Sequence, residues 1–357
     1  MRVNVLTPGF TTSNGSAFLF PLVVHRNALR AVSINIQMVQ RSSQGLTDCD
    51  VLAIDSKEFR NDWANDRSRT LELISSYSDA GTRLIWFDST DGTGTLQAAV
   101  FSVVDKYLKS QVLVDKSQYT QQTYGGRVHS AYYNESAGIT DDDGNAVDEP
   151  ITAEDTAKLG VSWNSGLADY STYGPKWIKL YRRIRFGRLL RYPSAIESPE
   201  SARPNDLSAR FGATYSRATV RYQREKIREL LKARLDTQKL SRRGYMNELR
   251  QSKTVLSPFG WGEITLKDFE VFLTGGMLLK PSVDHMQTWP NFYEKDVTYL
   301  SHKWDLSDLE EKIEWAIENE TQRREIASQA QQRYIGHTSG STAAEKFVSH
   351  FQNVIST

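Results

Sequence analysis

The loop and helix that follow Leu256 combine residue types that suit a nucleotide. An apolar run ends there, and a loop with Gly260 and Gly262 leads into a helix that we expect to begin near Glu263. Glycine lets a ligand approach the main chain closely, and free N–H groups at a helix start attract phosphate. Glu270, on the same helix, can accept hydrogen bonds from both hydroxyls of a ribose. The segment therefore predicts a site for a nucleoside diphosphate.

Three arginines upstream of this loop could serve the same site. Arg217 and Arg221 would share one helix face, as would Arg221 and Arg224. Cations at this place could stabilise the negative charge that builds up on a departing diphosphate. A solvated basic face paired with Glu225 and Glu229 fits the pattern equally well.

Two carboxylates follow the hydrophobic strand expected over residues 82–87. Asp88 and Asp91 stand at its carboxyl end, where α/β proteins place their active sites. A carboxylate or histidine there could act as the general base that takes a proton from a hydroxyl. Asp88 is the first candidate and Asp91 the second, followed by His25 and His129. Alternatively, Asp88 only caps the following turn.

A third candidate group is Trp163, Asn164 and Asp169. An indole can stack on a sugar ring, and amide and carboxylate groups can form paired hydrogen bonds with its hydroxyls. These residues are candidates for binding an acceptor sugar, although a packed tryptophan beside a turn explains them equally well.

Residues 176–191 form the one strongly basic stretch, with seven cations among aromatic and aliphatic side chains. Such a segment could lie on an anionic membrane surface. An interdomain helix whose long basic side chains extend to water is the alternative. Nucleic acid is a weaker candidate, because 44 basic and 43 acidic residues leave the whole chain at +1.

The order of the expected elements predicts how these residues are positioned. Strands over 2–7, 31–38 and 82–87 alternate with helices over 18–29 and 68–80, which is typical of a doubly wound α/β sheet. Prolines 193, 199 and 204 mark a linker, after which the pattern restarts. We therefore expect two facing Rossmann-like domains, over residues 1–195 and 205–340, with a cleft between them. A last helix, within 341–357, could pack back on the first domain.

The second half resembles a known family. Ser257-Pro258, the two loop glycines with Glu263, Lys267 and Phe269-Glu270 occur in the C-terminal domain of GT-B glycosyltransferases of the group 1-like or spore-maturation type, as do Trp289-Pro290 and Arg323 to Ala327 further on. The resemblance implies transfer of a sugar from a nucleotide-sugar donor to a hydroxyl of a glycan or lipid-linked acceptor, as in the synthesis of surface polysaccharides or glycoconjugates. It implies no metal and no other cofactor.

The residue patterns and the resemblance together predict roles for individual residues. Asp88, Asp91 and Glu263 would be catalytic. The donor would be bound by Gly15, Gly260, Trp261, Gly262, Glu263, Ile264, Lys267 and Glu270 together with the three arginines.

The stereochemistry and the reaction stay open at this stage. Many retaining members place seven residues between two glutamates, whereas six separate Glu263 from Glu270. A nucleotide-sugar epimerase or phosphorylase of the same fold, and a non-catalytic glycan- or membrane-binding module, are the alternatives.

The remaining features predict no metal site and no membrane span. Asp141–Asp148 resembles a calcium loop, but Thr152 stands where the bidentate glutamate should be. Cys49 is the single cysteine, so we expect a small core residue. No apolar run approaches the ~20 residues of a membrane span, and the chain starts with a strand-like run. We therefore expect a cytoplasmic protein, with peripheral contact to the inner face of the membrane as an option.

Overall fold

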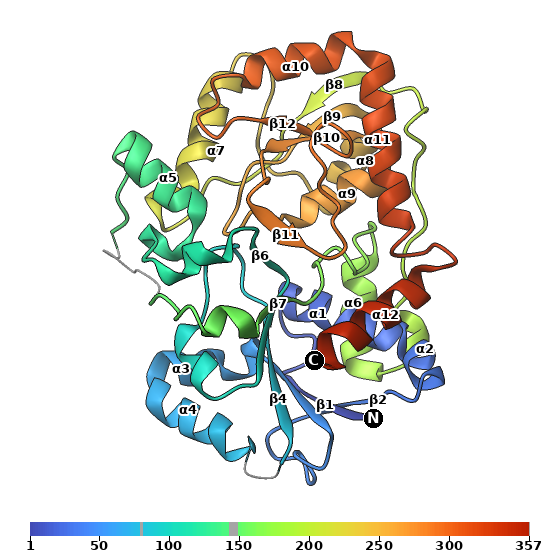
Figure 1. Ribbon diagram of the computed structural model, residues 1–357. Helices are drawn as coiled ribbons and strands as arrows, with labels where there is room; N and C mark the ends of the chain where they lie inside the picture. The colour runs from blue at the N-terminus through green and yellow to red at the C-terminus, as the bar shows by residue number, and fades with distance from the viewer. Residues whose placement is uncertain (79–80, 143–148, 357) are drawn as a thin grey trace.

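The computed structural model describes residues 1–78, 81–142 and 149–356, and it contains two parallel sheets flanked by helices (Figure 1). The first sheet has the order β2-β1-β3-β4-β5-β7, and the second has the order β12-β10-β9-β8. The predicted class, an α/β protein with two Rossmann-like sheets, is confirmed.

The first sheet is built from strands that run parallel throughout. Because helices cover both of its faces, its central strands are buried along almost their whole length and have continuous apolar sequences. The strands are β1 (Arg2–Leu6), β2 (Asn35–Val39), β3 (Val51–Asp55), β4 (Arg83–Asp88), β5 (Lys106–Lys109) and β7 (Leu159–Val161).

The helices of this first domain connect its strands or follow them. They are α1 (Ser13–Val24), α2 (Arg26–Ala31), α3 (Arg60–Asn65), α4 (Arg67–Ser76), α5 (Val128–Ala137) and α6 (Gly174–Ile184).

The second domain contains the shorter sheet and its helices. The strands are β8 (Asn205–Ser208), β9 (Ser252–Leu256), β10 (Met277–Pro281) and β12 (Leu300–His302). The helices are α7 (Ala218–Leu231), α8 (Arg242–Gln251), α9 (Leu266–Thr274), α10 (Leu309–Glu318) and α11 (Glu320–Ile335).

Two connections join the domains besides the linker. β6 (Gln111–Leu113), from the first half of the chain, pairs antiparallel with β11 (Met286–Thr288), from the second half. The last helix, α12 (Ala343–Ser356), leaves the second domain and lies against α2 of the first (Figure 1). Phe347 of α12 stacks on His25 with the ring centres 5.1 Å apart.

Several elements differ from the sequence-based expectations. The helix expected over 18–29 starts earlier, at Ser13, because the Thr12 side chain caps it by accepting a bond from the Gly15 N–H. The first strand after the linker, β8, is short and ends at Ser208. The polar stretch from 124 to 150 contains α5, and the calcium-like turn lies mainly at 143–148, outside the described residues.

Two side chains from these regions have clear structural roles. Asp141 accepts hydrogen bonds from the main-chain N–H and the hydroxyl of Thr219, at 2.9 and 2.8 Å, and so holds the start of α7. Cys49 is a free, buried thiol, as expected.

No helix within 1–78, 81–142 and 149–356 is both long and apolar enough to cross a membrane.

Candidate active site

A cavity of about 350 Å³ lies between the two domains. β4 of the first sheet ends beside it at Asp88, and the loop after β9 of the second sheet forms its other wall. Open α/β sheets bind ligands at the carboxyl ends of their strands, so this is the expected place for a substrate. The polar residues that line it are Asn14, Asp88, Ser89, Thr90, Asp91, Ser110, Gln111, Ser162, Ser165, Tyr215, Arg224 and Thr265.

The glycine loop contributes both to the cavity and to contact between the domains. Gly260, Trp261, Gly262 and Ile264 all line the cavity. A Cβ added to Gly262 would lie 2.4 Å from the main-chain nitrogen of Gly92, which belongs to the first domain. Glycine is therefore required at 262 by the close approach of the other domain.

Trp261 is held against the first domain as well. Its carbonyl accepts a hydrogen bond of 2.6 Å from Arg127, whose guanidinium lies 5.1 Å from the centre of the indole ring. This contact joins the loop to the segment just before α5.

Helix α9 begins at Leu266, where the apolar pattern of 266–273 predicts a helix, and not directly after the glycine loop near Glu263. Thr265 and Asp268 form a reciprocal capping box, which sets the first turn. The spacing of Thr265 and Asp268 was a sequence signal for this start. Asp268 is also buried in an ion pair with Lys280, at 3.1 Å.

Glu263 consequently lies in the loop and makes a contact between domains. It is fully buried and accepts a bond of 2.8 Å from the Thr93 N–H of the first domain. His285 lies 3.4 Å and His129 3.9 Å from its carboxylate. Burial opposes ionisation, but the two histidines hold the pKa of Glu263 well below its ordinary value. Glu263 does not line the cavity. Its side chain therefore has no direct contact with the space in which its predicted catalytic and donor-binding roles would place a substrate.

The three arginines of α7 diverge, and one of them reaches the cavity. Arg217 donates to the carbonyl of Gly125 at 2.9 Å, and Arg221 pairs with Glu225 at 3.5 Å. Arg224 is buried and lines the cavity.

Arg224 is held in place by main-chain carbonyls of the second domain. Its guanidinium donates to the carbonyls of Phe259, Gly212 and Pro258 and lies 5.1 Å from the centre of the Tyr215 ring. Burial lowers its pKa from the ordinary arginine value. Since these partners are neutral, the positive charge that borders the cavity remains available to an anion.

Lys267 has a similar environment behind the loop. Its ammonium donates to the carbonyls of Arg210 and Leu256, and it lies 5.5 Å from the centre of the Phe211 ring. Burial lowers the pKa of Lys267 to about 7, and the neighbouring charge of Arg224 adds to this effect.

Glu270 is buried and forms an ion pair with Arg242, so it is not free in this arrangement. Arg242 also donates to the carbonyls of Tyr170 and Ser171, at 2.7 and 3.0 Å. Burial raises the pKa of Glu270, and the Arg242 charge opposes that rise. Glu270 does not line the cavity, and a ribose would have to displace Arg242 from it.

Of the two candidate bases, Asp88 is the more completely bonded. It is buried and accepts bonds from the Lys109 ammonium at 2.9 Å, the Tyr107 hydroxyl at 2.8 Å and the Thr90 N–H at 2.8 Å. Burial opposes ionisation, yet Lys109 holds the pKa of Asp88 below its ordinary value. Lys109 and Tyr107 belong to β5, a strand that the sequence did not predict, so this pairing could not be anticipated.

Asp91 is less restrained. It is half-buried, borders the cavity and accepts a bond of 2.8 Å from the side chain of Asn14. His25, another candidate, is buried against α12, and burial lowers its pKa to about 4.

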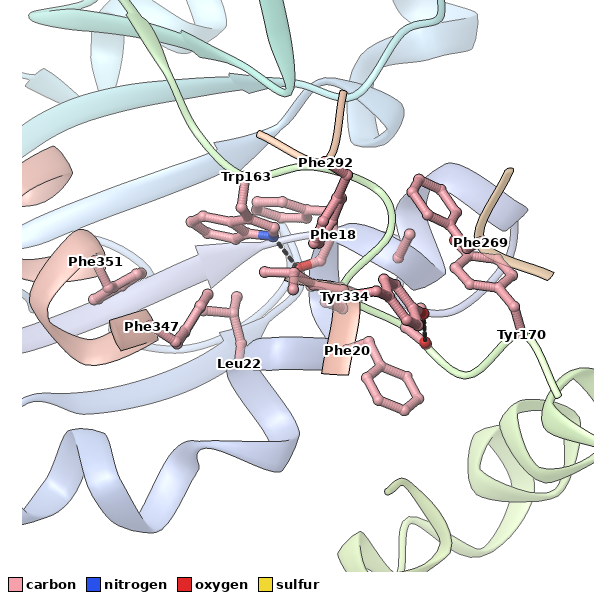
Figure 2. Close-up of a cluster of buried hydrophobic side chains, with 14 of the residues drawn as sticks. Phe18, Phe20, Leu22, Trp163, Tyr170, Phe269, Phe292, Tyr334, Phe347 and Phe351 are labelled. Atoms are coloured by element: carbon pink, nitrogen blue, oxygen red, sulfur yellow. Dashed lines mark hydrogen bonds between the residues drawn. The ribbon is translucent and has the colours of Figure 1, made fainter. Parts of the chain in front are cut away.

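The residues predicted to bind an acceptor are buried and mainly contact other parts of the protein. The Trp163 indole is 2% exposed, stacks on Phe18 and donates to the Phe18 carbonyl at 3.0 Å (Figure 2). Asn164 is fully buried, with its amide donating to the Thr288 hydroxyl at 3.1 Å. Asp169 is buried and accepts from the Ser171 N–H. Of the three, only Trp163 lines the cavity.

Gly15 lies in the first turn of α1 but is not among the cavity-lining residues. An added Cβ would meet the Thr12 hydroxyl at 3.0 Å and the Asp55 carboxylate at 3.8 Å. Asp55 was missed in the sequence. It is buried at the end of β3, accepts from the hydroxyls of Thr7 and Ser89, and has a pKa raised by burial.

Other polar residues of the cavity also escaped prediction. Ser110, Gln111 and Ser162 follow the short strands β5 and β7, whose sequences carry little strand signal. Within the described part of the chain, no group of three or more histidine, cysteine or acidic side chains is arranged to hold a metal ion.

Comparison with known proteins adds a family match for the second domain. Residues 208–349 match the model of a family described as glycosyl transferase-like. This stretch covers nearly all of the second domain and the start of α12, and the match confirms the glycosyltransferase resemblance of that domain. No curated protein matches the chain.

Solved structures with a similar layout include three bacterial proteins. A glycosyltransferase from Rickettsia africae ESF-5 is 9% identical, with 99% of this chain and 98% of that chain covered and a TM-score of 0.48. Anabaena Alr3699/HepE in complex with UDP-glucose is 10% identical, with coverage of 99% and 100% and a TM-score of 0.44. MurG of Acinetobacter baumannii is 9% identical, with coverage of 99% and 99% and a TM-score of 0.39.

Proposed function

We propose that this protein transfers a sugar from a nucleotide-sugar donor to a hydroxyl of a glycan or lipid-linked acceptor, without a metal ion. The observation that carries the proposal is the interdomain cavity with Arg224 at its border, in a chain whose second domain is glycosyl transferase-like. A buried guanidinium bonded only to neutral carbonyls suits the charge of a leaving diphosphate.

The donor would lie mainly on the second domain. The main chain of residues 260–264 and the guanidinium of Arg224 would bind the diphosphate, with Lys267 behind the loop. Glu270 would bind the ribose after release of Arg242. The first domain, residues 1–195, would supply the acceptor side.

The acceptor hydroxyl needs a base, and Asp91 fits that role better than Asp88. Asp88 is neutralised by Lys109, whereas Asp91 borders the cavity and accepts a single bond from Asn14. Serine, threonine and glutamine side chains around the cavity supply the hydrogen bonds that a sugar requires. Closure of the domains would exclude water and so limit hydrolysis of the donor.

The diphosphate site is tested by replacing Arg224. We expect Arg224→Met to weaken UDP or GDP binding by roughly 10- to 100-fold, since a hydrogen bond to a charged group contributes about 1.5–3 kcal/mol. Calorimetry would compare each diphosphate with its nucleoside, whose affinity should not change. Arg228→Met, one turn further along α7, is the matched control. Equal diphosphate affinity in the Arg224 and Arg228 variants would remove Arg224 from the site.

The reaction is tested by following a panel of nucleotide sugars by NMR. Transfer requires an acceptor hydroxyl, whereas an epimerase converts the donor without one. We expect Asp91→Asn to lower kcat by about 10²- to 10⁴-fold, the usual contribution of a general base, with unchanged donor affinity. Asp88→Asn should also lower activity, but by disturbing the Lys109 pair, so its unfolding midpoint should fall too. Full activity of Asp91→Asn would exclude Asp91 as the base.

A further inference from the structure

Helix α6 and the residues that follow it form a surface of exposed apolar and basic side chains, residues 173–191, here named the basic strip. We propose that the basic strip binds the surface of an anionic lipid bilayer. This inference is independent of sugar transfer, because it depends on a surface outside the interdomain cavity.

The basic strip is firmly attached to the first domain. Tyr181 is buried and meets the ring of Phe10 edge-on, with centres 5.0 Å apart. Gly174 lies so close to Asp169 that an added Cβ would be 2.1 Å from its carbonyl. The helix therefore has a fixed orientation on the first domain.

Large apolar side chains are exposed along this helix and just after it. Tyr173 and Ile184 are 57% and 59% exposed, Trp177 is 39% exposed, and Phe186 in the following turn is 54% exposed. The first three recur at intervals of four and seven residues, so they share one helix face. Exposed apolar residues this large usually mark an interaction surface, and tryptophan and tyrosine favour the membrane interface.

Positive charge surrounds these apolar residues. Seven lysines and arginines lie within 174–191, all of them exposed, and the segment contains no aspartate or glutamate. Since the whole chain carries only +1, the basic strip holds a strong local excess of charge. Anionic lipids attract such clusters, and an apolar contact combined with a basic cluster supplies the two signals that stable membrane attachment requires.

A bilayer fits this surface better than a nucleic acid or a second copy of the chain. Ile184 and Phe186 stand among the cations, and an aliphatic side chain such as isoleucine cannot stack on a base. A second copy would bring two sets of seven positive charges together. A lipid surface satisfies both the apolar and the charged side chains.

The test is co-sedimentation of the full chain with vesicles. Vesicles of phosphatidylcholine alone are compared with vesicles containing phosphatidylglycerol. One variant combines Arg182→Gln, Arg183→Gln and Arg188→Gln, and a second combines Trp177→Ser and Ile184→Ser. The charge-matched control combines Arg69→Gln, Arg243→Gln and Lys303→Gln, which are exposed cations elsewhere.

We expect wild type and control to bind anionic vesicles and to release them at high salt, as electrostatic attachment predicts. Both strip variants should bind at least tenfold more weakly, while their thermal unfolding and UDP affinity stay unchanged. The proposal is overturned if wild type does not sediment with anionic vesicles, or if the strip variants sediment as well as the control. It is also overturned if the same arginines mediate binding to an oligonucleotide instead of to vesicles.

Discussion

At the scale of single residues, the charges around the cavity are arranged in two different ways. Asp88 and Lys109 neutralise one another on the side of the first domain. Arg224, which borders the cavity on the side of the second domain, donates to main-chain carbonyls, as does Lys267 behind the glycine loop. A buried cation without a carboxylate is costly in the free protein, and an incoming diphosphate would relieve that cost. We therefore expect the anionic part of the proposed donor to bind on the second domain.

Lys267 gives this arrangement a pH dependence. Its pKa of about 7 lies far below the ordinary lysine value, so the ammonium loses its proton as the pH rises through 7. An anion binds the ammonium form and raises that pKa, so binding takes up a proton above pH 7. We expect UDP affinity to fall by up to about tenfold per pH unit above pH 7, following proton linkage.

Calorimetry between about pH 7 and pH 9, in buffers of different ionisation enthalpy, measures both the affinity and the proton uptake. Lys267→Met should bind UDP more weakly at pH 7 and lose the dependence on pH. Lys303→Met, on an exposed surface, should behave as wild type. A pH profile that is identical in wild type and Lys267→Met would show that another group titrates.

At the scale of elements, the sequence predicted the strand–loop–helix unit at 252–274 well. Four of the five residues of the strand that ends at Leu256 are buried, and glycines follow it. The helix starts at Leu266, directly after Thr265, which forms a capping box with Asp268. The pairing of β6 with β11 could not be predicted, since three-residue strands far apart in the chain carry no local signal.

Tertiary contacts that a single sequence does not reveal also explain why several predicted site residues have other contacts in the structure. Trp163 and Asn164 have the chemistry of sugar-binding residues, but their burial depends on Phe18 and Thr288, which lie far from them in the chain. Glu270 was predicted on the correct helix as a ribose-binding carboxylate, while its partner Arg242 lies on another helix. A single sequence shows which groups exist, and tertiary contacts decide which are free.

Gly262 makes the domain contact testable at this scale. Its missing Cβ lets the loop after β9 touch the main chain at Gly92, and a methyl group 2.4 Å from that nitrogen would force the domains apart. We expect Gly262→Ala to lower kcat by roughly a hundredfold, the effect of a misplacement of about 1 Å in a reacting pair, with little change in UDP affinity.

Steady-state kinetics and calorimetry together separate these two quantities. Gly244→Ala, on α8, is the matched control, because its new methyl group would meet only the end of the Ser241 side chain at 3.3 Å. Wild-type kcat in Gly262→Ala would mean that the reaction does not need this close contact.

At the scale of the whole molecule, the chain ends on the domain where it began. Helix α12 places Phe347 and Phe351 in the core that also contains Trp163 and Phe18, as Figure 2 shows in part. Lys106 at the start of β5 donates to the Val354 carbonyl at 3.0 Å. The first domain is therefore completed by helix α12, which follows the second domain in the sequence, and the two domains are joined by both the linker and this return.

Phe351 measures how much α12 contributes to the first domain. It is 1% exposed and lies 6.0 Å from the Trp163 ring, so truncation would leave a cavity in that core. We expect Phe351→Ala to lower the free energy of unfolding by about 3–5 kcal/mol, as for other buried phenylalanines, in urea titrations followed by tryptophan fluorescence. Gln352→Ala, on the exposed side of the same helix, should change it by less than about 0.5 kcal/mol. If the two variants unfold at the same urea concentration, α12 is not part of the core of the first domain, and its return across the molecule has no role in stability.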